Sequence, residues 1–185
     1  LKPSAQTPLC GEHFVSAFRQ AGLPEGVLQC LYLSHDSTTK MLGDSVVDFA
    51  CFTGSVAAGQ KIEKSAAGSF LGLSLELGGK DPAYVRADAK LDDCVNNLVD
   101  GAFFNSGQSC CGIERIYVEQ SLYSQFVEAY VEQVKNYTLD NPLLAETTLG
   151  PMVRTSAADW VRQHTSEALA KGAQACIDPN LFANS

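Results

Sequence analysis

Apolar positions along this chain alternate between two patterns. Short apolar runs rich in β-branched and aromatic residues are typical of buried strands, and they alternate with amphipathic segments that have helical spacing. The predicted strands are 26–33, 46–52, 70–77, 83–85 and 114–118, and the predicted helices are 7–21, 37–42, 55–67, 91–104, 120–137 and 157–172. This alternation predicts an α/β fold with a parallel sheet covered by helices. The last helix is expected to lay Trp160 and Val161 against the core.

Composition and charge limit the kinds of molecule that the protein is expected to bind. Hydrophobic residues make up 45% of the 185 residues and charged residues 18%, which is enough for one ordinary domain or two small ones. The net charge of −8 opposes binding to nucleic acid or to anionic lipid, because both need basic surface. No apolar stretch reaches membrane-spanning length. We therefore expect neither a nucleic-acid partner nor a membrane partner.

Cysteine usage indicates a reducing compartment. The chain has seven cysteines at irregular spacing and no C-x-x-C pair, which favours reduced thiols in an intracellular, cytoplasmic protein. The three histidines are far apart in sequence and form no ligand pattern with cysteine, so no metal site is expected. The chain begins at Leu1 without a signal-peptide pattern.

A pair of adjacent cysteines lies in a turn-like segment, 103–112, of small and polar residues. Glycine lets backbone N–H groups approach a bound atom closely, so a thiolate here could act as a nucleophile with an oxyanion donor beside it. Residue chemistry alone does not separate Cys110 from Cys111. The same segment is also compatible with a structural cysteine in an ordinary turn.

One carboxylate, Glu76, lies in an apolar run that ends at Gly78 and Gly79. Partial desolvation there would favour its neutral form and suit it to act as a general base. The alternative is a glutamate on the wet face of an edge strand.

A glycine turn at 54–59 follows an apolar strand and opens a helix, so N–H groups at the helix N-terminus could bind phosphate. It lacks the usual G-x-G-x-x-G spacing, and a bare turn is the alternative.

Four motifs occur in order and together resemble the aldehyde dehydrogenase superfamily. The general-base motif LELGGK is present at 75–80, and the nucleophile motif F-x-x-x-G-Q-x-C is matched by Phe103, Gly107, Gln108 and Cys110. Residues 2–8 look like the family's adenosine-side segment, and residues 52–55 look like its phosphate-side turn. The resemblance covers nearly the whole chain.

The resemblance implies an oxidoreductase that converts an aldehyde to a carboxylic acid with NAD or NADP. It implies that residues 1–78 form part of a Rossmann-like cofactor domain and that residues 79–185 form part of the catalytic domain. Such a chain would be an internal fragment of a longer protein. The oxyanion-hole asparagine and the glutamate that binds the nicotinamide ribose would then lie outside it.

By the same resemblance, Cys110 is the nucleophile, and Glu76 activates the water that hydrolyses the thioester. The implied cofactor contacts are Lys2, Ser4, Gly54, Ser55, Gly59 and Leu77. Family members strict for NAD often carry glutamate at the position of Ala5, so its absence leaves the choice of cofactor open. The small-molecule substrate would be an aldehyde, and the parent protein would form a homo-oligomer, a dimer or tetramer. A non-catalytic homologue with a structural or binding role is the alternative.

Overall fold

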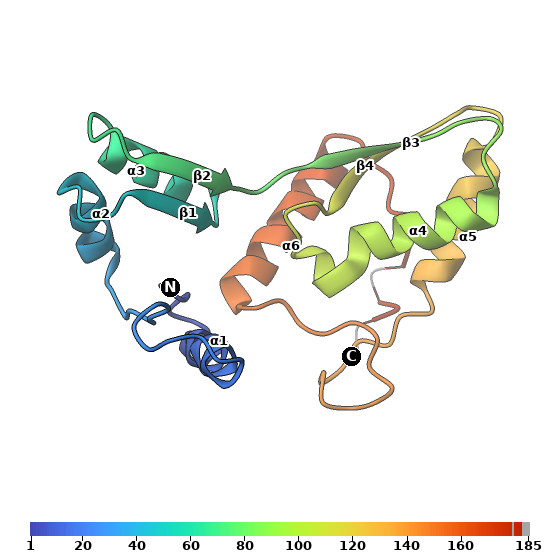
Figure 1. Cartoon of the computed structure of the whole chain (residues 1–185). Helices are drawn as coiled ribbons and strands as arrows, with labels where there is room; N and C mark the ends of the chain where they lie inside the picture. The colour runs from blue at the N-terminus through green and yellow to red at the C-terminus, as the bar shows by residue number, and fades with distance from the viewer. Residues whose placement is uncertain (179, 183–185) are drawn as a thin grey trace. The chain divides into compact units, whose positions relative to one another are not determined.

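The structure is a computed structural model that describes residues 1–178 and 180–182 (Figure 1). The chain divides into two compact units, Leu1–Leu77 and Gly78–Ser185. This boundary lies one residue before the predicted seam between 78 and 79. Helices and parallel strands alternate in both units, so the predicted α/β fold is confirmed.

The first unit is built around a two-stranded parallel sheet. Strands β1 (Phe49–Thr53) and β2 (Gly72–Glu76) pair in register from Phe49↔Gly72 to Thr53↔Glu76, and helix α3 (Val56–Ala66) connects them. Helix α3 packs against α2 (His35–Gly43), and α1 (Pro8–Gln20) precedes both. Val15, Leu42, Ile62 and Ala66 are the buried apolar side chains of this unit.

The strand predicted at 26–33 is absent, so this prediction was wrong. The N–H of Leu31 donates to the carbonyl of Leu1 (2.8 Å), and the amino group of Leu1 donates to the carbonyl of Gln29 (2.7 Å). These bonds connect the segment to Leu1 but do not make a strand ladder. An apolar run forms a strand only where a neighbouring backbone completes its hydrogen bonds.

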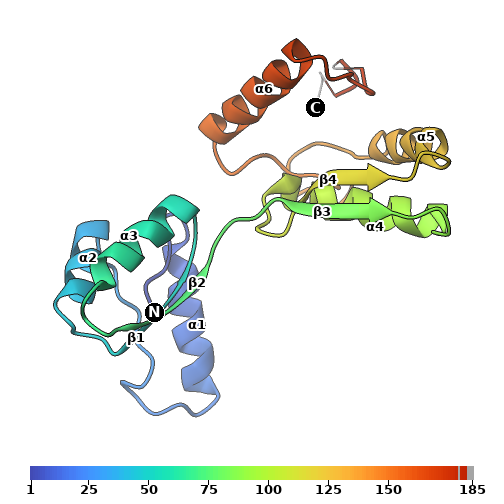
Figure 2. The ribbon, with the colours of Figure 1, turned by 90° about the horizontal axis from the view of Figure 1, so that it is seen from above.

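The second unit repeats the strand–helix–strand arrangement. Strands β3 (Asp81–Val85) and β4 (Ile113–Val118) are parallel, and helix α4 (Leu91–Phe103) with the short 3₁₀ turn η1 (Phe104–Gly107) joins them (Figure 2). Helix α5 (Tyr123–Val134) packs against α4. The inward side chains form one apolar core, made of Val85, Val95, Val99, Phe126 and Val134.

The last helix, α6 (Thr155–Ala170), does not bury the side chains predicted to face the core. Trp160 is 56% exposed and Val161 is 45% exposed, so this prediction was wrong. Trp160 packs instead against His164 of its own helix, with ring centroids 4.0 Å apart. Helical spacing shows which residues share a face, but it does not show that another element covers that face.

Over residues 1–178 and 180–182, no helix combines the length and apolarity needed to cross a membrane.

Candidate active site

The glycine turn and Glu76 lie together at the carboxyl edge of the β1–β2 sheet. Glu76 ends β2 opposite Thr53, and the N–H of Gly54 donates to the Glu76 carbonyl at 3.0 Å. Ser55 is the N-cap of α3, and its hydroxyl accepts from the N–H of Ala58 at 3.2 Å. The N–H groups of Val56 and Ala57 precede the first intrahelical bond, which runs from the N–H of Gly59 to the Ser55 carbonyl at 2.9 Å. This edge therefore presents an exposed helix N-terminus beside the end of β2.

Gly59 and Leu77 form a packing contact inside the first unit. Gly59 is buried, and a Cβ built on it would lie 2.7 Å from Cδ2 of Leu77. The missing side chain lets α3 approach the residue that follows β2. Gly59 therefore serves close helix–strand packing, which is the role of the last glycine in dinucleotide-binding turns.

Lys2 and Ser4 lie on the segment before α1. The ammonium of Lys2 donates to the Pro3 carbonyl at 3.3 Å, and the hydroxyl of Ser4 accepts from the N–H of Gln6 at 3.2 Å. Ser4 is exposed, and Lys2 is half-buried. Both side chains therefore make local bonds at the start of the first unit.

The expected desolvation of Glu76 is not present in the described residues, because its side chain is exposed. Along β2 the half-buried Leu73 and Leu75 alternate with the exposed Ser74 and Glu76. A strand with period-two burial sends every second side chain to solvent. The apolar run had suggested burial, whereas the register places the carboxylate on the wet face.

The cysteine loop follows η1 and leads into β4. Cys110 and Cys111 are both exposed, and all seven cysteines of the chain are unpaired. The Sγ of Cys111 lies 3.3 Å from the hydroxyl of Ser109. Phe103 does not line this loop, since its ring packs against Tyr137 in the core with centroids 5.6 Å apart. The exposed Cys110 thiol is therefore the loop sulfur without a serine neighbour at hydrogen-bond distance among the described residues.

The glycine pair after Glu76 meets this loop. A Cβ built on Gly79 would lie 2.8 Å from the carbonyl oxygen of Cys110. The N–H of Asp81 donates to the Gly112 carbonyl at 3.3 Å, and Lys80 pairs with Glu114. The end of the LELGGK motif and the cysteine loop therefore lie side by side at the amino ends of β3 and β4.

Sequence reasoning missed this contact. Gly79 can be seen in the sequence as the second glycine of LELGGK. A glycine pair alone, however, does not show which backbone segment it approaches.

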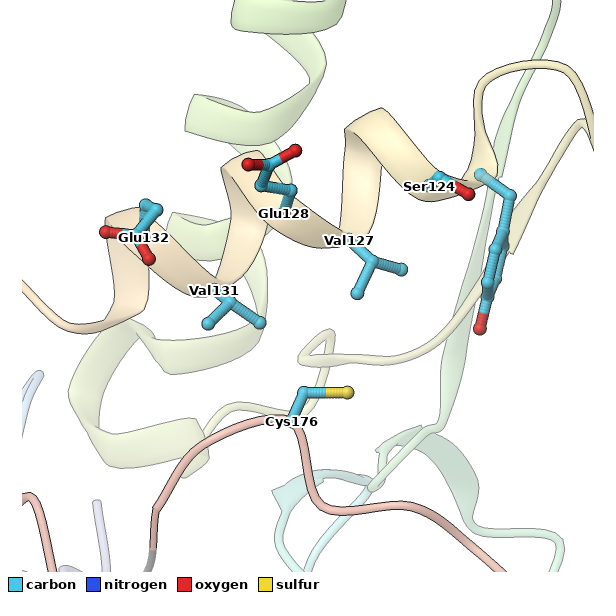
Figure 3. A pocket seen from close by; sticks show the side chains of 7 residues that line it. Ser124, Val127, Glu128, Val131, Glu132 and Cys176 are labelled. Atoms are coloured by element: carbon cyan, nitrogen blue, oxygen red, sulfur yellow. The ribbon is translucent and has the colours of Figure 1, made fainter.

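Two hollows lie along α5. The first has a volume of about 410 Å³, and Val127, Glu128, Val131 and Cys176 are among its lining residues (Figure 3). The second, about 520 Å³, is mostly apolar and includes Tyr130. Burial raises the pKa of Tyr130 to about 12, with a smaller contribution from Tyr137.

Neither hollow contains Cys110. Across the part of the chain that the structure describes, no group of three or more His, Cys, Asp or Glu side chains is arranged to hold a metal ion.

These features define an α/β protein with a strand–turn–helix segment that exposes a helix N-terminus in one unit and a cysteine loop in the other. The family model described as "Aldehyde dehydrogenase family" matches residues 1–184. Aldehyde dehydrogenase 1A1 of Homo sapiens is 36% identical over 176 residues, which cover 94% of this chain and 35% of that protein.

Two solved structures have the same fold. Lactaldehyde dehydrogenase from Escherichia coli is 35% identical with a TM-score of 0.88, covering 95% of this chain and 37% of that one. An NAD-dependent aldehyde dehydrogenase from Sinorhizobium meliloti is 31% identical with a TM-score of 0.88, covering 94% and 35%.

The chain belongs to the aldehyde dehydrogenase family. It spans about a third of the length of the curated relatives that it matches.

Proposed function

We propose that the protein oxidises an aldehyde to a carboxylic acid, with a nicotinamide dinucleotide as oxidant and Cys110 as nucleophile. Family membership supports the reaction class. The observation that carries the residue assignment is the close approach of Gly79 to the Cys110 carbonyl, three residues after Glu76. It ties the end of the base motif to the nucleophile loop.

Cys110 forms the covalent intermediates in this proposal. Its thiolate adds to the aldehyde carbon and gives a tetrahedral thiohemiacetal, whose oxyanion is stabilised by the N–H of Cys110 itself. Loss of hydride from that carbon leaves a thioester on the sulfur. The exposed thiol is open to a small aldehyde, whereas the Cys111 sulfur lies beside Ser109.

Glu76 acts in the second half of the reaction. Its carboxylate takes a proton from the water that attacks the thioester carbonyl, which releases the acid and regenerates the thiol. An exposed carboxylate at the end of β2 is free to hold such a water. An enzyme that passed its acyl group to another thiol would have less need of this base.

The cofactor site fits the first unit. Ser55 and the free N–H groups in the first turn of α3 offer donors and a positive dipole end for a pyrophosphate. A nicotinamide dinucleotide bound there would supply the hydride acceptor for the thiohemiacetal on Cys110. Ala5, exposed near Lys2 and Ser4, presents no carboxylate to repel a 2′-phosphate, so use of NADP as well as NAD is part of the proposal.

Three variants of the full-length protein test the assignment. Cys110→Ser should lower aldehyde oxidation at least about 10³-fold, because the nucleophile is lost. Glu76→Gln should retain a burst of one reduced cofactor per site and lose about 10²-fold or more in steady-state turnover, because only hydrolysis is blocked. Cys111→Ser and Glu63→Gln, an exposed glutamate on α3, are the matched controls and should keep parental rates.

Acid and reduced cofactor are measured together after addition of a simple aldehyde with NAD or NADP. A parent without activity, or a Cys110→Ser variant that matches its parent, would reject the proposal and favour the non-catalytic homologue. The homo-oligomer and the cytoplasmic location stay predictions.

A further inference from the structure

Three consecutive residues before the thiol adopt left-handed backbone conformations. The φ values are 51° for Asn105, 59° for Ser106 and 73° for Gly107. Glycine adopts this region freely and asparagine tolerates it, but serine does so rarely. Such a conformation persists only where surrounding contacts fix it, and these positions are often at functional sites. The contacts that fix this turn are therefore informative.

Both the nitrogen and the oxygen of the Gln108 side-chain amide make hydrogen bonds. Its Nε2 donates to the Asn105 carbonyl at 3.0 Å, which closes the turn, and its Oε1 accepts from the N–H of Val153 at 2.8 Å. The Asn105 amide returns a bond to the Gln108 carbonyl at 3.1 Å. With both ends engaged, Gln108 has its amide committed to the protein and not to a substrate.

Ser106 makes a second bond to the same distant segment, since its hydroxyl donates to the Gly150 carbonyl. The turn is thus bonded twice to 150–153, at sequence separations of 44 and 45 residues. The loop has a further backbone contact, since Gly79 lies against the Cys110 carbonyl. The segment that carries Cys110 is therefore in contact with two other backbone segments, 150–153 and Gly79.

We propose that Gln108 is a positioning residue that sets the location of the Cys110 sulfur by bonding the strained turn to Val153, with Ser106 as its second anchor. The kinetic part of this inference rests on the proposed function. A reacting atom displaced by about 1 Å loses up to about a hundredfold in rate, so a device that fixes the loop acts on kcat more than on substrate binding.

The test uses four variants of the full-length protein. Gln108→Met keeps the length of the side chain and removes both bonds, and Ser106→Ala removes the bond to Gly150. The double variant combines them, and Gln125→Met, at an exposed glutamine on α5, is the matched control. Circular dichroism and melting temperature verify the folding of each one.

Gln108→Met should lower kcat at least about tenfold and leave both KM values within about twofold. The double variant should lose less than the product of the two single losses, because both bonds hold the same segment. Iodoacetamide labelling followed by peptide mapping gives a second readout that needs neither aldehyde nor cofactor. The Cys110-to-Cys111 labelling ratio should change about threefold or more in Gln108→Met and Ser106→Ala, and not in the control.

A lower melting temperature with unchanged kcat and an unchanged labelling ratio would mean a structural role only and would overturn the inference. If the parent oxidises no aldehyde, the proposed function fails, and the labelling ratio still decides the inference by itself. If Gln108→Met does not fold, Ser106→Ala decides it by the same two readouts.

Discussion

Gly79 offers the sharpest test of how the thiol loop is held. Replacing it with alanine would add one methyl group that faces the carbonyl oxygen of Cys110 at 2.8 Å and Oδ1 of Asp81 at 3.0 Å. The first distance falls about 0.6 Å short of the 3.4 Å at which ordinary van der Waals contact begins. The Asp81 side chain can rotate away. The Cys110 carbonyl is backbone, so relief requires the nucleophile loop itself to move.

The expected cost follows from that displacement. Forcing an extra methyl group into a close-packed contact costs about 1–3 kcal/mol. A loop shift of roughly half an ångström should lower kcat about tenfold, since a shift of about 1 Å can cost a hundredfold. The KM for the cofactor should stay within about twofold, because its proposed contacts lie in the first unit.

The neighbouring glycine is the matched control. A Cβ on Gly78 would meet nothing within 4 Å, so Gly78→Ala makes the same chemical change in open space. Both variants of the full-length protein are compared by kcat, KM and melting temperature. If Gly79→Ala keeps the parental kcat and stability, or if Gly78→Ala is impaired equally, the close approach does not hold the loop and the reasoning is refuted.

Four further changes have defined outcomes. Ser55→Asp should keep the α3 cap, with unfolding free energy within about 0.5 kcal/mol, yet raise the KM for cofactor about tenfold or more because a carboxylate would face phosphate. Ala5→Glu should lower kcat/KM with NADP about tenfold relative to NAD, by like-charge repulsion. The pKa of Tyr130, raised by burial to about 12 from 10.0, lies above its unfolded value. Its contribution to stability is therefore complete below pH 10 and lost as the pH rises toward 12. Tyr130→Phe should remove this alkaline loss in denaturant titrations, while Tyr123→Phe, at an exposed tyrosine of the same helix, should not. Val99→Ala should cost about 2 kcal/mol in urea unfolding, because the side chain is 2% exposed, and a cost below about 0.5 kcal/mol would contradict its place in the core.

The local pattern of apolar residues predicts most of the helices and strands, but it does not predict which other elements pack against them. The segments around α3, α4 and β4 have strong periodicity and clear ends, and they form where the sequence predicts them. The run at 26–33 is also apolar, but its backbone bonds to Leu1 do not make a ladder, and it stays irregular. Trp160 lies on a helix face that no described element covers. Both wrong predictions, the strand at 26–33 and the burial of Trp160, depend on contacts with distant parts of the chain. A short stretch of sequence does not show such contacts.

The same limit applies to the candidate site: the sequence shows motif residues, but it does not show contacts between residues that are far apart in the chain. Cys110 and Glu76 could be proposed as site residues from the sequence because they lie in motifs of fixed spacing that resemble those of the family. The bonds from Ser106 and Gln108 to 150–153 were not, because they join residues more than 40 positions apart without a shared motif. The exposure of Glu76 also depended on register, which a one-residue shift would reverse.

The positions of the two sheets along the chain explain why residues 76–80 take part in both of the proposed sites. In open parallel sheets, ligands bind at the carboxyl ends of strands, and the proposed cofactor turn at Ser55 lies at such an end, after β1. The cysteine loop does the opposite, since it lies at the amino ends of β3 and β4. Residues 76–80 run from the carboxyl end of β2 to the amino end of β3, so they join these two edges directly. An insertion after Gly78 would leave each sheet intact and lengthen only this connection. We then expect kcat to fall while the unfolding free energy of each unit stays unchanged. That result would mean that the loss of activity comes from the connection at 76–80 and not from unfolding of either unit.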